Sequence, residues 1–214
     1  MGLGFEALSV GLLETNCYLI WDELSSQALI LDPGDEAMRI ARRARELGLS
    51  VVAVAITHGH VDHAGAAGSL AELFGVPVLV HPADLDLLQA MPFQASMFGL
   101  PEPDPIPETA PLRDGDRVVL GRSVLEVRHT PGHSAGSVSL LSQDGRKAWV
   151  GDLIFQGAVG RTDLPGGSVA ALRDSLRSVI LSLPDDWVLC PGHGPLTTVG
   201  EERSANPFVH ELGG

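Results

Sequence analysis

The sequence predicts an α/β sandwich, in which two sheets pack together and helices cover their outer faces. Three observations support this prediction. Short apolar segments of strand length recur along the chain, stretches with helical periodicity stand between them, and each half of the 214 residues repeats strands followed by helices. The length, with 44% hydrophobic residues, suits a sizeable core, so we expect a single domain over residues 1–214.

The first half of the chain begins with segments that have the composition of strands, over residues 5–10, 16–22 and 27–32. A change of period then predicts a helix over residues 35–48, which Asp35 would cap. The apolar stripe of this helix would consist of Met38, Ile40, Ala41, Ala44 and Leu47. The continuous apolar run over residues 50–57 is typical of a strand that is covered on both faces.

The remaining elements are predicted by the same patterns. Helical periodicity is expected over residues 64–75, 82–90 and 168–183. Strands are expected over residues 76–81, 117–120, 123–130, 137–142, 147–155 and 186–194, and the last one runs into a loop.

Residues 91–111 differ from this pattern, because they combine six prolines with four large apolar residues. The apolar residues are Met91, Phe93, Met97 and Phe98. A disordered linker would not keep such a cluster, so we expect an ordered surface flap. This flap would either wall a substrate pocket or form the contact of a homodimer.

Charge and cysteine content limit the classes of partner and compartment. The formal net charge of −13 opposes binding to a phosphate backbone, so we expect no nucleic-acid partner. The two cysteines, Cys17 and Cys190, give no disulfide framework, which favours a reduced, cytoplasmic location. The N-terminal residues lack the pattern of a secretory signal, and no apolar run has the length of a membrane span, so we expect no membrane association.

Four potential metal ligands stand within six positions at the end of the predicted strand over residues 50–57. They are His58, His60, Asp62 and His63. Imidazole and carboxylate groups are ligands for divalent metals, and a loop after a buried strand is a usual place for ligand chemistry. Four such groups exceed what one strand or helix could direct at a single ion. Two adjacent ions explain the cluster better.

Three further candidates, His133, Asp152 and His193, occupy comparable places at later strand ends. Glycine or proline stands beside each of them, so the backbone can bend closely around a bound group. Seven ligands would then come from four strand ends. The isolated histidines His81, His129 and His210 are interpreted as structural or surface residues.

Several motifs of the chain resemble the metallo-β-lactamase superfamily. THGHVDH over residues 57–63 is similar to the metal-binding motif of that superfamily. TNCYLI, LILDPG, HTPGHSAGS, GDLIF, GRTDLPGG and PGHGPLTTVGEERSANPF resemble segments of its short, single-domain glyoxalase II-like branch. This resemblance implies a four-layer αββα sandwich of two mixed sheets flanked by helices, with the metals at one edge.

The resemblance also implies a role for each ligand. His58, His60 and His133 would hold one ion, Asp62, His63 and His193 would hold the second, and Asp152 would bridge them. Zinc, iron or manganese would suit these ligands. The implied substrate is a small-molecule thioester of the hydroxyacylglutathione type. The chain runs only 21 residues past His193, so the C-terminal helical domain that supplies the glutathione site of full-length glyoxalase II does not carry over.

The expected reaction is hydrolysis, in which a hydroxide shared by two divalent ions attacks the thioester carbonyl. Asp62 would bind its ion and orient the nucleophile as the catalytic residue. Arg161 is the candidate for substrate binding, with an ion pair to Asp163 as the alternative. Asp32 would support a ligand histidine or fix a turn. Cys17 is interpreted as a buried structural residue, and no separate base stands beside Cys190.

The main rival function is that of a persulfide dioxygenase, a class that this chain also resembles. His58, His133 and Asp152 could then hold one iron. The runs PGHGP and LPGG favour hydrolysis. A lactonase would need the only tyrosine, Tyr18, to reach the ligands. A secreted β-lactamase, a nuclease and a closed structural metal site are disfavoured by the absent signal pattern, the negative charge and the number of ligands, respectively.

Overall fold

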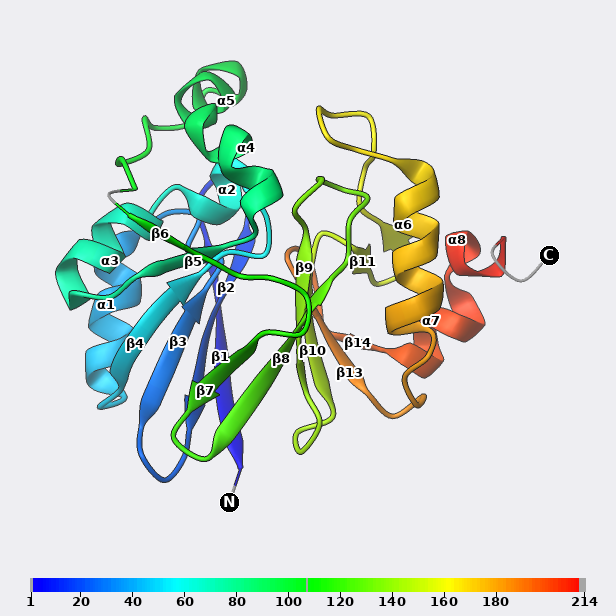
Figure 1. The fold of residues 1–214 in the computed structure, drawn as a ribbon, viewed down its shortest axis with the longest axis horizontal. Helices are drawn as coiled ribbons and strands as arrows, with labels where there is room; N and C mark the ends of the chain where they lie inside the picture. Colours follow the sequence, from blue (N-terminus) through cyan, green and yellow to red (C-terminus); the bar gives the residue numbers. More distant parts are fainter. Residues whose placement is uncertain (1, 107, 212–214) are drawn as a thin grey trace.

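Two six-stranded sheets face each other and helices cover their outer faces, which confirms the predicted α/β sandwich (Figure 1). The computed structural model describes residues 2–106 and 108–211. The predictions for Pro107 of the flap and for residues 1 and 212–214 of the domain therefore lie outside the described residues.

The first sheet comes from the first half of the chain and has the strand order β1-β2-β3-β4-β5-β6. Its strands are β1 (Leu3–Val10), β2 (Thr15–Asp22), β3 (Gln27–Leu31), β4 (Ser50–Ala55), β5 (Val78–Val80) and β6 (Thr109–Pro111). The first three strands pair antiparallel, whereas β3 to β6 pair parallel. The sheet is therefore mixed, and the carboxyl ends of its parallel strands meet at one edge.

The second sheet comes from the second half and has the order β14-β13-β10-β9-β8-β7. Its strands are β7 (Arg117–Leu120), β8 (Ser123–His129), β9 (Val138–Ser142), β10 (Lys147–Gly151), β13 (Val188–Pro191) and β14 (Thr197–Thr198). Only β10 and β13 pair parallel. A small hairpin, β11 (Ile154–Phe155) and β12 (Ala158–Val159), lies apart from both sheets.

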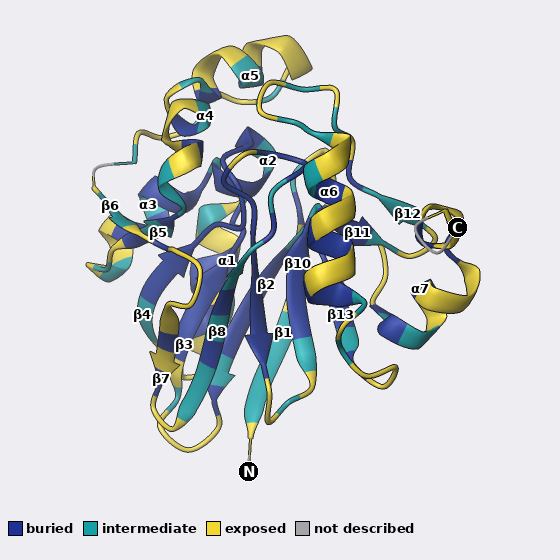
Figure 2. Cartoon of the chain, turned by 45° about the vertical axis from the view of Figure 1, so that its right-hand side comes forward, coloured by how far each residue is buried: buried dark blue, intermediate teal, exposed yellow. Residues whose placement is uncertain are grey.

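The helices form the outer layers and cover one edge of the sandwich (Figure 1). They are α1 (Ala37–Glu46), α2 (Val61–Ala64), α3 (Ala67–Phe74), η1 (Pro82–Asp84), α4 (Leu85–Gln89), α5 (Met91–Phe98), α6 (Val169–Ser175), η2 (Leu176–Ile180), α7 (Val199–Ala205) and α8 (Pro207–His210). The first sheet is covered by α1 and α3, and the second by α6, η2 and α7. Figure 2 shows strands such as β2 and β3 largely buried, β1 half-buried and the outward side of α6 exposed.

Alternation along the strands explains why both faces of each sheet are apolar. In β2, Tyr18 and Ile20 point between the sheets, whereas Cys17 and Leu19 pack on the helix side. All four side chains are buried. A strand that packs on both faces needs a continuous apolar run, which is the pattern seen in the sequence.

The predicted strand over residues 147–155 breaks in the structure after Gly151. This glycine has a φ of +49°, and the pairing of β10 with β13 shifts register there. The backbone turn carries Asp152 out of the sheet, between β10 and β11. The predicted strand was therefore wrong in its length, and the break places Asp152 at the edge of the sandwich.

In its described residues, 91–106 and 108–111, the flap contains more regular structure than expected. It begins with helix α5 and ends with the edge strand β6. Met91 is buried, but Phe93, Met97 and Phe98 are exposed. Gln94 holds α5 to the edge, because its Oε1 accepts from the Val61 N–H at 3.0 Å. The homodimer contact stays a prediction.

Two further details of the helices differ from the sequence prediction. Helix α1 buries Ile40, Ala41 and Ala44, but Met38 is exposed instead of joining the stripe. The predicted helix over residues 168–183 continues from α6 into the π-helix η2. In the described part of the chain, no helix has the length and apolar character that a bilayer crossing requires.

Candidate metal centre

All seven predicted ligand residues lie together at one edge of the sandwich, where loops follow strands of both sheets. Four come from the segment after β4, which leads into the short helix α2. His133 follows β8, Asp152 follows β10 and His193 follows β13. The sequence therefore placed these residues correctly at strand ends, and the fold brings the four ends to one edge.

The first ligand group consists of His58, His60 and His133, whose candidate ligand atoms all lie within 4.8 Å of one another. His60 Nδ1 and His133 Nε2 are 2.9 Å apart. The rings of His58 and His133 stand nearly perpendicular, with centroids 4.6 Å apart. All three residues are buried, so these nitrogen atoms converge in a site that is largely closed to water.

The second ligand group consists of Asp62, His63 and His193. Asp62 Oδ2 lies 3.2 Å from His193 Nε2 and 3.7 Å from His63 Nε2. The two imidazole Nε2 atoms are 3.4 Å apart. This group is more open than the first, because the side chain of His193 is 28% exposed.

Asp152 lies between the two groups and contacts both. Its Oδ2 is 3.6 Å from His133 Nε2 and 3.7 Å from His193 Nε2, and its Oδ1 is 3.3 Å from His63 Nε2. One carboxylate therefore faces the first and second ligand groups at once. This position suits a ligand that is shared by two ions.

The spacing of these atoms fits metal coordination. Ligands bound tetrahedrally at 2.0–2.1 Å from a zinc ion are roughly 3.3 Å from one another. The six separations given for the second group and Asp152 scatter around that value. Among the described residues, His58 Nε2 and Asp152 Oδ1 are buried without a hydrogen-bond partner. Such atoms are costly to bury unless something binds them, and a divalent cation would do so.

Charge distinguishes the two groups. Burial and the neighbouring histidines hold the pKa of His58 well below its usual value, and the same causes lower the pKa of His60 to about 4. Burial also opposes protonation of His63, but the carboxylates of Asp152, Asp32 and Asp62 outweigh it and raise its pKa. His58 and His60 of the first group are therefore neutral imidazoles, whereas the second group is an anionic environment that favours positive charge.

Asp32 supports the second group from behind, which confirms the sequence prediction for this residue. Its Oδ2 lies 3.0 Å from His63 Nδ1, on the far side of the ring from the ligand atom Nε2. It also accepts hydrogen bonds from the Thr57 N–H at 2.6 Å and the Thr57 hydroxyl at 2.8 Å. Asp32 thereby fixes both the orientation of His63 and the start of the ligand loop.

Asp84 supports the first group, and sequence reasoning missed it. This fully buried carboxylate accepts from the Gly59 N–H at 2.9 Å, the Ser134 hydroxyl at 2.6 Å and the Gly136 N–H at 2.6 Å. It joins the loop of His58 and His60 to the loop of His133. The available signal was an acid directly after a buried strand, in HPAD, which was interpreted only as a helix start.

Main-chain oxygens fix the rings of the two later histidines. His133 Nδ1 lies 2.8 Å from the Arg161 carbonyl oxygen, and His193 Nδ1 lies 3.0 Å from the Leu13 carbonyl oxygen. The guanidinium of Arg161 is exposed and forms a two-armed ion pair with Asp163, at 2.7 and 2.8 Å. The alternative role for Arg161, an ion pair with Asp163, is therefore present in the structure. A contact between Arg161 and a substrate stays a prediction.

The other candidate groups take no part in the two ligand groups. Cys17 and Cys190 are buried free thiols, and burial raises the pKa of Cys190 to about 12, so neither is a ready nucleophile. The Tyr18 hydroxyl lies near the centre but donates to the Pro191 carbonyl at 2.7 Å. His81 stacks on His129, as expected for structural residues. His210 Nε2 lies 2.9 Å from the Ser204 carbonyl oxygen.

This fold, with ligand loops at one edge of two facing sheets, defines the class of protein. The family model of the metallo-beta-lactamase superfamily matches residues 10–193, which include all seven candidate ligands. The chain belongs to the metallo-β-lactamase superfamily, and the resemblance seen in its motifs is confirmed. Hydroxyacylglutathione hydrolase GloC of Haemophilus influenzae is 39% identical over 210 residues, which cover 97% of this chain and 99% of that protein.

Solved structures agree with this assignment. TTHA1623 in a di-iron-bound form has a TM-score of 0.87 and 39% identity, over 95% of this chain and 99% of that one. The B3 metallo-β-lactamase BLEG-1 has a TM-score of 0.86 and 34% identity, over 96% and 99%. ETHE1 from Myxococcus xanthus has a TM-score of 0.79 and 30% identity, over 98% and 89%. Because the names of these proteins differ, similarity alone does not assign a substrate.

Proposed function

We propose that this protein is a metal-dependent hydrolase of small thioesters of the S-2-hydroxyacylglutathione type, and that it holds two divalent cations. The observation that carries the proposal is the pair of ligand groups that meet at Asp152. The identity of 39% with the hydroxyacylglutathione hydrolase GloC, over nearly the full length of both chains, supports the thioester as the substrate class.

The two ligand groups have different tasks in this proposal. When bound, two divalent cations would polarise the thioester carbonyl and lower the pKa of water. His58, His60 and His133 provide nitrogen ligands in a buried site, and burial keeps His58 and His60 neutral. Asp62 is the catalytic residue. Its pKa is held below the usual range because His63 and His193 outweigh the effect of burial, so it stays an acceptor that can orient a water molecule.

The chain does not need to supply a nucleophile or a strong general acid for this reaction. A thiolate is a good leaving group, because its conjugate acid has a pKa near 8.5 in water. The two cysteines are buried thiols with raised pKa values. Hydrolysis of a thioester therefore matches what the site offers, whereas hydrolysis of an amide would need a proton donor for the amine.

The ligand atoms limit the cations to a few candidates. Histidine nitrogen and carboxylate oxygen suit zinc, iron and manganese, so we propose these three as the candidates. The di-iron form of TTHA1623 supports iron as one of them.

A second candidate function is that of an iron-dependent persulfide dioxygenase. The observation that favours it is the cluster of two histidines and one carboxylate, in which His133 Nε2 lies 3.6 Å from Asp152 Oδ2 and His58 lies beside His133. A single-iron enzyme would leave Asp62 and His193 without a task. Their close approach at 3.2 Å therefore favours the hydrolase.

One experiment on the purified protein distinguishes the hydrolase from the dioxygenase. The metal content of the protein is measured first, and the protein is then loaded with zinc, iron or manganese. We expect thiol release from S-lactoylglutathione and no oxygen uptake with glutathione persulfide. In the His193→Ala variant thiol release should fall at least about a hundredfold, because the second ligand group is broken. Oxygen uptake that survives this substitution would establish the dioxygenase instead. The surface variant His210→Ala serves as the matched control.

A further inference from the structure

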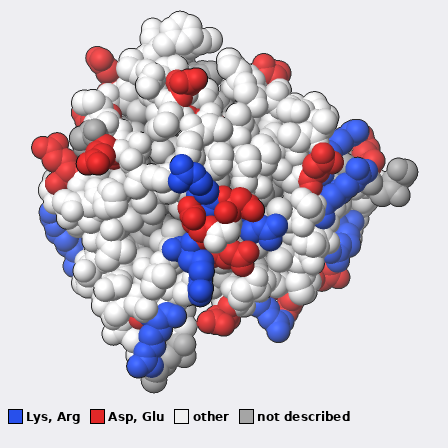
Figure 3. Space-filling view, in the orientation of Figure 1, with Lys and Arg blue, Asp and Glu red and all other residues white. Residues whose placement is uncertain are grey.

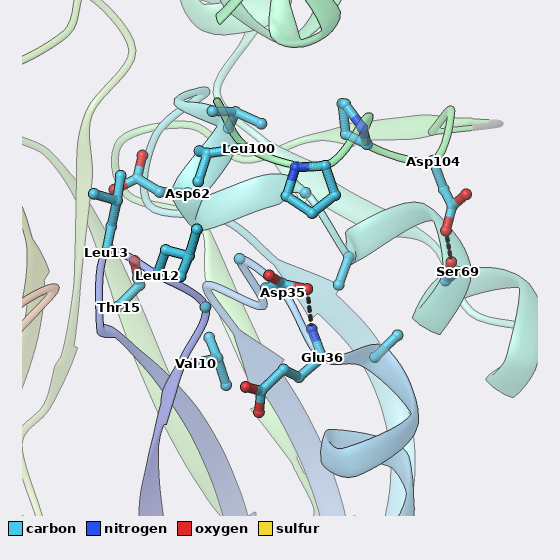
Figure 4. A pocket seen from close by; sticks show the side chains of 18 of the residues that line it. Val10, Leu12, Leu13, Thr15, Asp35, Glu36, Asp62, Ser69, Leu100 and Asp104 are labelled. Carbon is cyan, nitrogen blue, oxygen red and sulfur yellow. Dashed lines mark hydrogen bonds between the residues drawn. The ribbon is translucent and has the colours of Figure 1, made fainter. Parts of the chain in front are cut away.

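A cavity of about 410 Å³ opens beside the second ligand group. Its walls come from the turn between β1 and β2, the start of α1, the region of α2 and α3, and residues 100–104 of the flap (Figure 4). Asp62 lines it, and so does Leu13, whose carbonyl oxygen lies 3.0 Å from His193 Nδ1. A thioester whose carbonyl group lies at the metal centre can therefore extend one of its two ends into this Leu13 pocket.

The Leu13 pocket has an apolar end and a polar end. Three apolar side chains stand at the end where Asp62 lies (Figure 4), and they are Leu12, Leu13 and Leu100. Leu12 and Leu13 are 76% and 44% exposed. Asp104 lies at the opposite end of the pocket (Figure 4). Exposed apolar side chains that gather at one end of a cavity indicate a binding site for an apolar group, because such a group would remove them from water.

Most carboxylates of the lining already have partners. Glu36 pairs with Arg39, and Asp104 accepts a hydrogen bond from the Ser69 hydroxyl. Asp62 is a ligand of the second cation in the proposed function. Arg39 is the only cationic residue in the described lining, and its guanidinium is engaged. The carboxylates of a glutathionyl group therefore gain nothing in the pocket and stay hydrated outside it, whereas an alkyl group gains from burial.

Thr15 adds one polar group to the pocket, close to the second ligand group. Its backbone pairs with that of His193 in an isolated bridge. Its side chain lines the pocket and is 1% exposed, and its Oγ1 has no hydrogen-bond partner among the described residues. A buried hydroxyl without a partner is costly, so it favours a ligand hydroxyl that approaches it. The 2-hydroxyl of a 2-hydroxyacyl group is such a partner, because it stands on the carbon next to the thioester carbonyl.

We propose that the Leu13 pocket binds the acyl group of the thioester, and that it selects 2-hydroxyacyl groups whose aliphatic chain is longer than that of lactoyl. This inference rests on the proposed function and narrows only the acyl part of its substrate class, so glutathione remains the thiol. The aliphatic chain lies against Leu12, Leu13 and Leu100. The 2-hydroxyl faces Thr15, and the glutathionyl group extends away from the pocket.

The test compares three glutathione thioesters, those of lactic, 2-hydroxyhexanoic and hexanoic acid, by thiol release from the metal-loaded protein. We expect kcat/KM for 2-hydroxyhexanoyl at least about eightfold above that for lactoyl, because each added methylene group contributes about twofold in a partly exposed pocket. The Thr15→Val variant should lower the preference for 2-hydroxyhexanoyl over hexanoyl about fivefold, because one hydrogen bond is lost. A general structural effect of this substitution would lower kcat/KM for both thioesters and leave their ratio unchanged.

A second variant tests the apolar end of the pocket. Leu12→Asp should lower the preference for 2-hydroxyhexanoyl over lactoyl at least about threefold, because it removes an apolar contact and places a charge beside the aliphatic chain. Leu12 is exposed in the turn between β1 and β2, so this change leaves the core intact. The matched control is Leu24→Asp, the same substitution at an exposed leucine in the turn between β2 and β3. It should leave both preferences unchanged.

The outcomes distinguish the acyl pocket from the hydrolase. Hydrolysis of all three thioesters without a preference for the longer 2-hydroxyacyl group would overturn the pocket assignment and leave the hydrolase intact. A preference that both Leu12→Asp and Thr15→Val leave unchanged would do the same, because the acyl group would then bind elsewhere. If the metal-loaded protein releases no thiol from any of the three, the proposed function itself fails and the assignment of an acyl pocket fails with it.

Discussion

The two ligand groups of the metal centre face each other across Asp152 but are built in different ways. The first consists of three buried imidazoles and contains no carboxylate. The second contains Asp62 and includes His193, whose side chain is partly exposed. The supports also differ, since Asp84 joins the loops of the first group whereas Asp32 and the Leu13 carbonyl hold the second.

This difference indicates a division of labour within one site. An enclosed set of nitrogen ligands suits an ion that stays in place, and an open set with an anionic ligand suits an ion that meets water and substrate. The surface charge does not follow this division. Figure 3 shows basic and acidic side chains intermixed over the region of β8, where Arg128 forms ion pairs with Asp114 and Glu126.

The largest effect is expected from Asp152→Ala, because this carboxylate serves both groups. Metal content should fall from two ions per chain to below one, and thioester hydrolysis should fall at least about a thousandfold. Elemental analysis and a thiol-release assay measure the two quantities, and circular dichroism checks the fold. A variant that is fully active without bound metal would rule out the proposed mechanism.

A comparison of His60→Ala with His193→Ala tests whether the groups are separate sites. Each variant should lose about one ion per chain, because each substitution removes a ligand from one group only. Hydrolysis should fall at least about a hundredfold in both cases. If either substitution alone released both ions, the two groups would act as one site and the division between them would be wrong.

The supporting carboxylates are expected to have smaller effects that follow the same division. Asp84→Asn should weaken metal binding to the first group about tenfold to a hundredfold, and Asp32→Asn should do the same for the second. Double variants provide the readout. The loss of metal affinity caused by Asp84→Asn should persist in the His193→Ala background and vanish in the His60→Ala background. A general loss of stability would lower metal affinity in both backgrounds.

The smallest effect is expected from Arg161→Ala. The exposed ion pair with Asp163 contributes little to stability, so the variant should keep its fold and stay within about twofold of the original kcat/KM. A tenfold rise in KM for a carboxylate-bearing thioester would show instead that Arg161 binds substrate beside the first group.

The ligand residues could be predicted from the sequence because their signals are local. All of them follow an apolar strand, and glycine stands beside each one except Asp62 and His63, so both the element and its end can be identified. The same holds for the central strands β2, β3, β9 and β10. Their continuous apolar runs follow from burial on both faces, which few other structures would require.

Features that depend on contacts between distant segments escaped prediction. Asp84 is recognised as a support only when the loops of Gly59 and Gly136 meet around it, which no local pattern reveals. The elements after His193 were missed for a different reason. Helix α7 begins with a capping box formed by Thr198 and Glu201, which is a local signal that the sequence contains.

The hydrogen bond between Leu13 and His193 joins positions 180 residues apart. During synthesis the hairpin of β1 and β2 leaves the ribosome long before β13 is made. The Leu13 carbonyl in the turn of this hairpin therefore cannot bind His193 until much later. The second ligand group is therefore completed only when synthesis reaches His193, whereas Asp62 and His63 are present from the first half of the chain onward.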